Sequence, residues 1–255
     1  MAPEMTNYIN GAFTKTAKTI DSLNPATGKI LGKVPDSGQQ EVDAAVDAAC
    51  TAFATWSKTT PEHRAEILVK IADTIQARIA EFARAESQDQ GKPVSLALAM
   101  DIPRAIQNFR FFASSIQFQD EQSSCAGGFL NYVTREPVGP VALISPWNLP
   151  LYLLTWKIAP CLAYGCTAVC KPSEFTSLTA FMLCQVMHDA GLPAGVCNMV
   201  FGTGPSVGAH LVAHPSVPAI SFTGGTVPAS NIGYGEIYLR ISCQAQQKSQ
   251  SRARR

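Results

Sequence analysis

The stretch from Val138 to Glu174 most constrains the fold, because it holds two short apolar runs with a crossover between them. The first run, residues 141–144, leads through a Ser-Pro-Trp-Asn turn into an apolar segment long enough for a helix. The second run, residues 167–170, ends on Lys171. A helical crossover makes such strands parallel and places Asn148 and Lys171 at their carboxyl ends, where open α/β sheets bind ligands. We therefore expect the ligand site at this edge of the sheet.

The same alternation of strand and helix continues along the chain. After the first helix, expected at 149–164, the pattern predicts helices at 176–190 and 205–212 and strands at 196–200 and 219–222. This order predicts an α/β fold with a doubly wound, Rossmann-like parallel sheet whose core covers residues 138–226.

In residues 1–137 the pattern of turns and apolar residues predicts small strands followed by amphipathic helices. Asn10-Gly11 and the turn at 24–28 each separate short apolar runs, as in antiparallel hairpins. Apolar residues recur at helical spacing over three stretches, at 41–56, 61–86 and 94–118, the last interrupted around Pro103.

The polar segment 119–128 reads as a loop, and residues 129–135 alternate like a strand that stands apart from the main sheet. We expect residues 1–226 to form one structural unit. The tail, residues 227–255, has lost the strand and helix order and is expected to be disordered. The sheet would then end bare near Phe222.

Composition narrows the classes of partner. The chain is 46% hydrophobic and 15% charged with a formal net charge of +1, so electrostatics favours neither nucleic acid nor an acidic membrane surface. The sequence has no signal peptide and no run of apolar residues long enough to span a membrane, which predicts a cytoplasmic protein. Its eight cysteines are scattered and read as reduced thiols.

No metal is expected. The group Cys161, Cys166 and Cys170 falls in apolar segments and is interpreted as small hydrophobic residues. His210 and His214 have the spacing of two ligands on one helix face, but the glutamate of a zinc protease is missing and His214-Pro215 falls at the helix end.

Three motifs follow one another along the chain: Ser145-Pro146-Trp147-Asn148, Lys171-Pro172-Ser173-Glu174 and Phe222-Thr223-Gly224-Gly225. Together they resemble the aldehyde dehydrogenase superfamily, over residues 5–226, about the first half of a family chain. Within it, residues 100–115 and 145–160 are most similar to the muconic semialdehyde dehydrogenases.

The resemblance implies a role for each motif. Asn148, which by itself reads as a helix N-cap, would donate to the aldehyde oxygen once a cysteine thiolate has attacked. Lys171 and Glu174, otherwise a surface lysine and a helix-start acid, would contact the adenosine ribose of a dinucleotide. A carboxylate there repels a 2′-phosphate, so NAD is favoured over NADP. Ser145, Pro146, Trp147, Pro172 and Ser173 complete these two cofactor-binding motifs.

Glycines supply the rest of the implied cofactor site. The segment 202–208 has G-x-G-x-x-x-G spacing, unlike the dinucleotide fingerprint, and alone reads as turn glycines. The resemblance places Gly204 and Pro205 beside the adenine and Gly224 and Gly225 beside the pyrophosphate. Family members usually carry serine where this chain has Gly225, which removes one phosphate contact.

The catalytic cysteine and glutamate of the family are missing. There is no Glu-Leu-Gly-Gly, and in the tail, faintly similar to an Asn-x-Gly-Glu-x-Cys context, Tyr238 takes the place of the nucleophile. Cys243 follows five residues later. The sequence thus predicts a chain from an NAD-dependent enzyme that oxidises an aldehyde, by resemblance a muconic semialdehyde, but that is inactive alone. The alternative is a non-catalytic fragment that binds nucleotide or associates with subunits. Family members form homo-oligomers, which we do not carry over to this chain.

Overall fold

The computed structural model describes residues 4–233 and 244–245. Seven strands form a central sheet in the order β11-β10-β7-β8-β9-β1-β2, and two further sheets, β3-β4 and β5-β6, have two strands each. The strands are β1 (Asn7–Ile9), β2 (Ala12–Thr14), β3 (Thr19–Leu23), β4 (Ile30–Pro35), β5 (Ser123–Ala126), β6 (Phe129–Tyr132), β7 (Pro140–Ile144), β8 (Thr167–Lys171), β9 (Cys197–Met199), β10 (Ala219–Gly224) and β11 (Gln244–Ala245).

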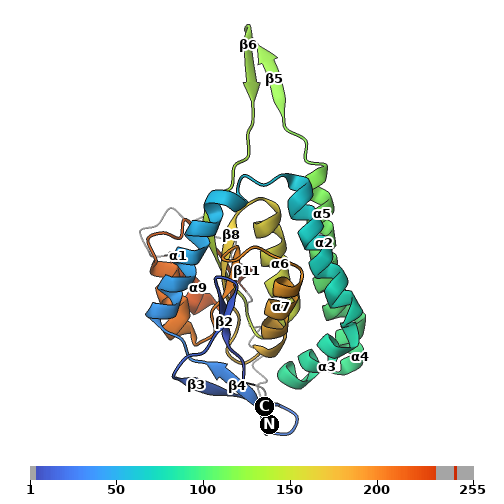
Figure 1. Ribbon diagram of the computed structural model, residues 1–255, viewed down its shortest axis with the longest axis vertical. Helices are drawn as coiled ribbons and strands as arrows, with labels where there is room; N and C mark the ends of the chain where they lie inside the picture. The colour runs from blue at the N-terminus through green and yellow to red at the C-terminus, as the bar shows by residue number, and fades with distance from the viewer. Residues whose placement is uncertain (1–3, 234–243, 246–255) are drawn as a thin grey trace, which may run out of the picture.

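The helices surround this sheet (Figure 1). They are α1 (Gln39–Trp56), α2 (Pro61–Ala77), α3 (Ile79–Gln90), α4 (Val94–Leu96), α5 (Ile102–Gln117), α6 (Pro150–Ala163), α7 (Leu178–Asp189), α8 (Ala209–Ala213) and α9 (Thr226–Gly233), with π-helical turns η1 (Ala97–Asp101) and η2 (Gly204–Gly208). Within the described ranges, none of them has both the length and the apolar character that crossing a membrane requires.

The centre of the sheet is parallel, as predicted. β7 pairs with β8 on one side and with β10 on the other, and β8 pairs with β9. The chain therefore winds outward from β7 to β9 and then returns to the opposite side of β7. This reversal between β7 and β10 is the topological switch point of a doubly wound fold.

The first strands join this sheet rather than forming a separate one. Tyr8 in β1 pairs with Met199 in β9, and the β1-β2 turn contains Asn10 and Gly11 in left-handed conformation, with φ of 51° and 76°. The predicted hairpin is thus confirmed. Because α1 also packs on β8 and β9, residues before 138 complete the fold of the sheet that follows them.

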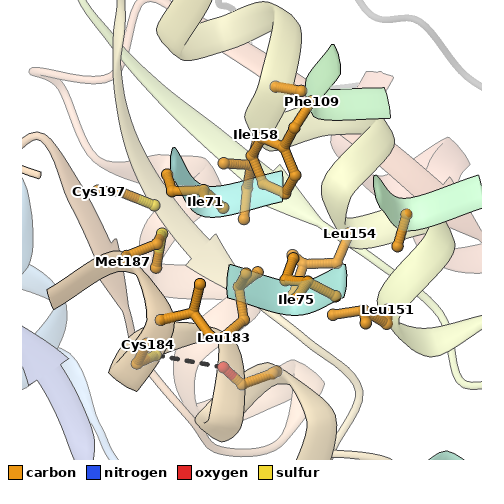
Figure 2. Close-up of a cluster of buried hydrophobic side chains, with 14 of the residues drawn as sticks. Ile71, Ile75, Phe109, Leu151, Leu154, Ile158, Leu183, Cys184, Met187 and Cys197 are labelled. Carbon is orange, nitrogen blue, oxygen red and sulfur yellow. Dashed lines mark hydrogen bonds between the residues drawn. The ribbon is translucent and has the colours of Figure 1, made fainter. Parts of the chain in front are cut away.

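Two apolar cores lie on the two faces of the sheet. On one face α6 and α7 pack on the strands and are backed by α2 and α5, while α1, α8 and α9 cover the other (Figure 1). Side chains from four helices meet in the first core (Figure 2). Leu154 and Ile158 of α6 are buried there, since this helix lies between the sheet and α2. This position explains why the α6 sequence is apolar on nearly every side.

Two expectations need correction, and a third agrees with the structure. Residues 119–128 are not all loop, because Ser123–Ala126 form β5, which pairs with β6 across Gly127 and Gly128 at φ of 59° and 81°. Residues 61–86 are not one helix, since Arg78, at φ −109° and ψ 19°, separates α2 from α3. The helical stretch at 94–118 is interrupted by η1 just before Pro103, as expected.

The tail also differs from the expectation of disorder. Thr226–Gly233 form α9, in which Ile232 is buried in the core on the α1 face of the sheet. β11 pairs in parallel with Thr223 and Gly224, so the expectation that the sheet ends bare near Phe222 is wrong. Burial of Ile232 supplies the apolar anchor that composition alone did not indicate. Tyr238 and Cys243 lie outside the described residues.

Candidate functional site

The three predicted motifs meet at one edge of the sheet. Ile144 pairs with both Lys171 and Phe222, so the turns that follow β7, β8 and β10 start side by side. The backbone N–H of Ser145 donates to the carbonyl of Lys171 at 3.2 Å, which joins the first two turns. This edge is the carboxyl end of the strands at the switch point, where doubly wound sheets bind ligands.

The turn after β7 presents two buried polar atoms. Within the described residues, Oγ of Ser145 and Oδ1 of Asn148 have no hydrogen-bond partner. Asn148 does not cap α6, because Leu149 occupies the N-cap position, without a side-chain bond, and Pro150 begins the helix. The N-cap interpretation of Asn148 is therefore wrong. Since buried polar groups are nearly always bonded, this amide oxygen can accept a hydrogen bond from a donor at the edge.

The turn after β8 holds an ion pair. Nζ of Lys171 lies 2.8 Å from Oε2 of Glu174, and the side chain of Lys171 is 5% exposed while that of Glu174 is 24% exposed. Glu174 precedes the first residue of α7, Leu178, by four positions, so it is not a helix-start acid. The buried lysine instead fixes the carboxylate at the mouth of the turn. Pro172 and Ser173 are buried beneath it, and Trp147 of the neighbouring turn is exposed.

The glycines of the edge differ in what they accommodate. A Cβ on Gly224 would lie 2.4 Å from the Phe222 ring, so packing requires glycine there. A Cβ on Gly204 would meet nothing within 4 Å, and on Gly225 only Pro228 at 3.6 Å. A methyl group would therefore meet nothing at Gly204 and would make ordinary van der Waals contact at Gly225. Gly204 and Pro205 are exposed at the start of η2.

A buried polar network behind Asn148 escaped the sequence analysis. The Gln90 side chain donates to the carbonyl of Asn148 at 3.4 Å. One turn earlier in α3, Glu86 is fully buried and accepts from Thr179 at 2.8 Å. Lys92 lies 4.0 Å from Glu86 and 2.5 Å from Asp101. Buried charged groups from α3, η1 and the turn between them therefore lie behind the carboxyl edge of β7, β8 and β10, which we call the ligand edge.

Two carboxyls of this network have pKa values that burial raises. Burial raises the pKa of Glu86 to about 7, although Thr179 and Lys92 favour its charged form. The backbone N–H of Leu151, in the first turn of α6, also interacts with Glu86. Burial likewise raises the pKa of Asp89 to about 6, against bonds from Leu178 and Ser22.

The spacing of residues in α3 does indicate the two buried acids of this network. Phe82, Glu86 and Asp89 have the spacing i, i+4 and i+7, so both acids lie on the apolar face of α3. An acid on an apolar face indicates a buried, paired carboxyl.

Two grooves lie away from the strand ends. One, between α5 and α6, is lined by Arg104, Gln107, Asn108, Phe111, Tyr152 and Trp156. The guanidinium carbon of Arg104 lies 5.4 Å from the centroid of the Tyr152 ring. Tyr152 and Trp156 are in the first two turns of α6, directly after Asn148.

The second groove lies between α1 and α8 and includes both predicted helix-face histidines. Nε2 of His214 is 3.6 Å from Oδ1 of Asp43, and its Nδ1 accepts from the backbone of Ser216 at 3.2 Å. His214 occupies the C-cap position of α8, and its ring is engaged by α1 on one side and by the following turn on the other. Over the part of the chain that the structure describes, no three acidic, histidine or cysteine side chains are arranged to hold a metal ion.

The comparisons with known proteins agree with this geometry. A family model described as the aldehyde dehydrogenase family matches residues 13–235, past the end of the resemblance at 226. The 2-aminomuconic semialdehyde dehydrogenase of Danio rerio is 57% identical over 225 residues, and the human protein of that name is 53% identical over 228. The alignments cover 88% and 89% of this chain but 46% and 47% of those proteins.

Solved structures give the same result. The NAD+ complex of an aldehyde dehydrogenase from Bacillus cereus superposes with a TM-score of 0.90 at 36% identity, covering 94% of this chain and 51% of that one. An indole-3-acetaldehyde dehydrogenase complexed with NAD+ gives a TM-score of 0.92 at 34% identity over 98% and 52%. The chain thus spans about half the length of its relatives. On the family match and these identities, it belongs to the aldehyde dehydrogenase family.

Proposed function

We propose that this chain is the NAD-binding part of an aldehyde dehydrogenase and binds NAD at the carboxyl edge of β7, β8 and β10. The observation that carries the proposal is the Lys171–Glu174 ion pair, 2.8 Å long and fixed in a buried turn at the switch point. Two solved relatives with NAD+ bound, at 36% and 34% identity, support it.

Each part of the edge has a role in this proposal. The carboxylate of Glu174 accepts from the ribose hydroxyls and repels a 2′-phosphate, and Lys171 holds that carboxylate in place. The absence of side chains at Gly204 and Gly225 lets the adenine and the pyrophosphate approach the backbone closely. NAD, when bound, supplies the acceptor for the hydride that leaves the oxidised aldehyde.

We further propose that the chain alone does not oxidise aldehydes. Asn148 supplies an oxyanion donor, but the reaction also needs a thiolate at the same edge. Cys170 directly precedes Lys171, yet its thiol is buried and lies 3.8 Å from Cys197. Burial also raises its pKa, which leaves it a poor nucleophile.

For the parent activity we propose a semialdehyde substrate, which carries an acid group at its other end. The α5–α6 groove supports this choice, because aromatic walls suit a conjugated chain and Arg104 suits a carboxylate. Muconate, a conjugated dicarboxylate, is a suitable probe: it should quench the fluorescence of the parent chain, and Arg104→Met should weaken that binding. Equal binding by the parent chain and the variant would reject Arg104 as the carboxylate partner.

Subunit association is the second candidate, favoured by the β5–β6 hairpin. It projects from the body of the molecule (Figure 1), and Phe129, Leu130 and Tyr132 are 75%, 65% and 68% exposed. Large apolar side chains exposed to this extent favour a protein interface. The seven unpaired cysteines among the described residues support a reducing, cytoplasmic location for the assembly.

Calorimetric titration with NAD and NADP tests the main proposal. The chain should bind NAD at least about tenfold more tightly than NADP, and Glu174→Gln should narrow that difference by removing the charge that repels the 2′-phosphate. Glu81→Gln, which removes an exposed carboxylate from α3, is the matched control. Equal affinities in the parent chain, or a folded chain that binds neither nucleotide, would refute NAD binding. NADH formation with aldehydes tests catalysis separately.

A further inference from the structure

The C-terminus of α6 is closed by a Schellman motif built on two cysteines. Gly165 is left-handed, at φ 81°, and its N–H donates to Leu162 at 3.1 Å. The N–H of Cys166 donates to the carbonyl of Cys161 at 3.0 Å. These are the two bonds of the motif, which places the side chains three positions before the cap and two after it on the same side of the helix end, and the Cys161 thiol donates to the carbonyl of Thr167 at 3.5 Å. In this chain those side chains are the thiols of Cys161 and Cys166.

The surroundings of the two thiols shift their pKa values in opposite directions. The Cys161 thiol first, then the backbone amides of Val138 and Gly139 and the Arg64 guanidinium, lower the pKa of Cys166 to about 6. The interaction with Cys166 raises the pKa of Cys161 well above its ordinary value. Cys166 is therefore the thiolate of the pair, and Cys161 keeps its proton.

Arg64 is fixed at this place by the backbone. Its side chain is buried, its Nε donates to the carbonyl of Ala163 at 2.7 Å, and its Nη1 donates to Thr59. Two anions favour its charged form, the carboxylate of Glu62 first and then the Cys166 sulfur. A cation with bonded backbone on both sides keeps this geometry without the thiolate.

The dithiol is less deeply buried than the other thiol pair and stands apart from the ligand edge. Cys161 is partly exposed and Cys166 is 8% exposed, whereas Cys170 and Cys197, the other thiol pair, are at most 1% exposed. Cys166 directly precedes β8, whose opposite end carries Lys171. The pair therefore takes no part in cofactor or aldehyde binding.

We propose that Cys161 and Cys166 form a peroxide-reactive dithiol site that closes to an intramolecular disulfide. The Cys166 thiolate attacks one oxygen of hydrogen peroxide, the O–O bond breaks, and Cys166 becomes a sulfenic acid, while the hydroxide that leaves takes a proton from solvent to become water. The Cys161 thiol then displaces the sulfenic oxygen, which leaves as a second water, and the S–S bond forms. Two thiols are oxidised by two electrons and one peroxide is reduced to two waters.

The test uses the full chain, hydrogen peroxide and peptide mapping by mass spectrometry. The folded chain should lose two hydrogens, with Cys161 and Cys166 joined. Cys161→Ser should stop at a sulfenic acid that dimedone traps on Cys166, and Cys166→Ser should leave Cys161 reduced. Cys184→Ser, which removes a buried thiol from α7, is the matched control and should still form the disulfide. Circular dichroism verifies that each variant is folded.

A measurement on the unaltered chain tests the cysteine pair even if a variant does not fold. Iodoacetamide alkylation of Cys166 should rise only about twofold between pH 6 and pH 8.5, because the thiol is already half ionised at pH 6. A peptide thiol of ordinary pKa, about 8.5, rises about 150-fold over the same range. A rise as steep as that of the peptide, or peroxide treatment that leaves both cysteines reduced, would overturn the proposal.

Discussion

Replacing Glu86 with glutamine should stabilise the chain at alkaline pH and not at acid pH. Glu86 lies in α3 and is fully buried. Its Oε2 accepts from Thr179, and its Oε1 has no hydrogen-bond partner among the described residues. Lys92, at 4.0 Å, offsets only part of the free energy of burying the charge. Glutamine keeps the shape and the bond to Thr179 but carries no charge.

The size of the effect follows from the pKa of Glu86. Burial raises it from 4.5 to about 7, and each pKa unit corresponds to about 1.4 kcal/mol, so this group contributes about 3 kcal/mol of pH-dependent stability. Because the folded pKa lies above the unfolded one, that stability is fully present below pH 4.5 and is lost as the pH rises through 7. Glu86→Gln cannot ionise at this position, so the variant does not lose this stability as the pH rises.

Urea unfolding of the parent chain and of Glu86→Gln at pH 5 and pH 8 measures it. The difference in the free energy of unfolding should favour the variant by about 2–3 kcal/mol more at pH 8 than at pH 5. Asp89 adds its own pH dependence, but it is present in both proteins and cancels. Glu81→Gln on the exposed side of α3 should change stability by less than about 1 kcal/mol. A difference that does not vary with pH would refute the reasoning.

Three other changes have definite outcomes. Gly225→Ser, which fits because its Cβ would meet only Pro228 at 3.6 Å, should tighten NAD binding about tenfold in a calorimetric titration by restoring one phosphate contact. Arg64→Met should lower the free energy of unfolding by about 2–4 kcal/mol in urea, since two backbone carbonyls lose their donor. Leu130→Ser with Tyr132→Ser should reduce the sedimentation coefficient of any assembly and leave NAD affinity unchanged.

The parallel centre of the sheet could be predicted because β7 and β8 are buried on both faces. Such strands read as unbroken apolar runs, and the runs ending at Ile144 and Lys171 are separated by a segment that only a helical crossover can span. The short strand at 123–126 was missed because its residues are small and polar, and it is exposed along its whole length. The Gly127-Gly128 pair was its only signal.

The residues that line the edge could be predicted from position, but those that support it could not. Asn148 and Glu174 follow strands directly, so topology alone brings them together. The bond between Glu86 and Thr179 joins residues 93 positions apart, and the partner of a buried acid depends on how α3 packs against α7. Periodicity assigns a residue to a face and leaves open which residue faces it.

Helix α6 connects the two chemical features of the molecule and also keeps them apart. Its 14 residues span about 21 Å, from the turn of Asn148 at the ligand edge to the cysteines at its C-terminus. Glu86 contacts the first turn and Arg64 bonds to the last, so both ends are held by buried charged side chains from α3 and α2. Oxidation of the proposed dithiol would therefore remove the negative charge beside Arg64 at the end of α6 that lies opposite the ligand edge.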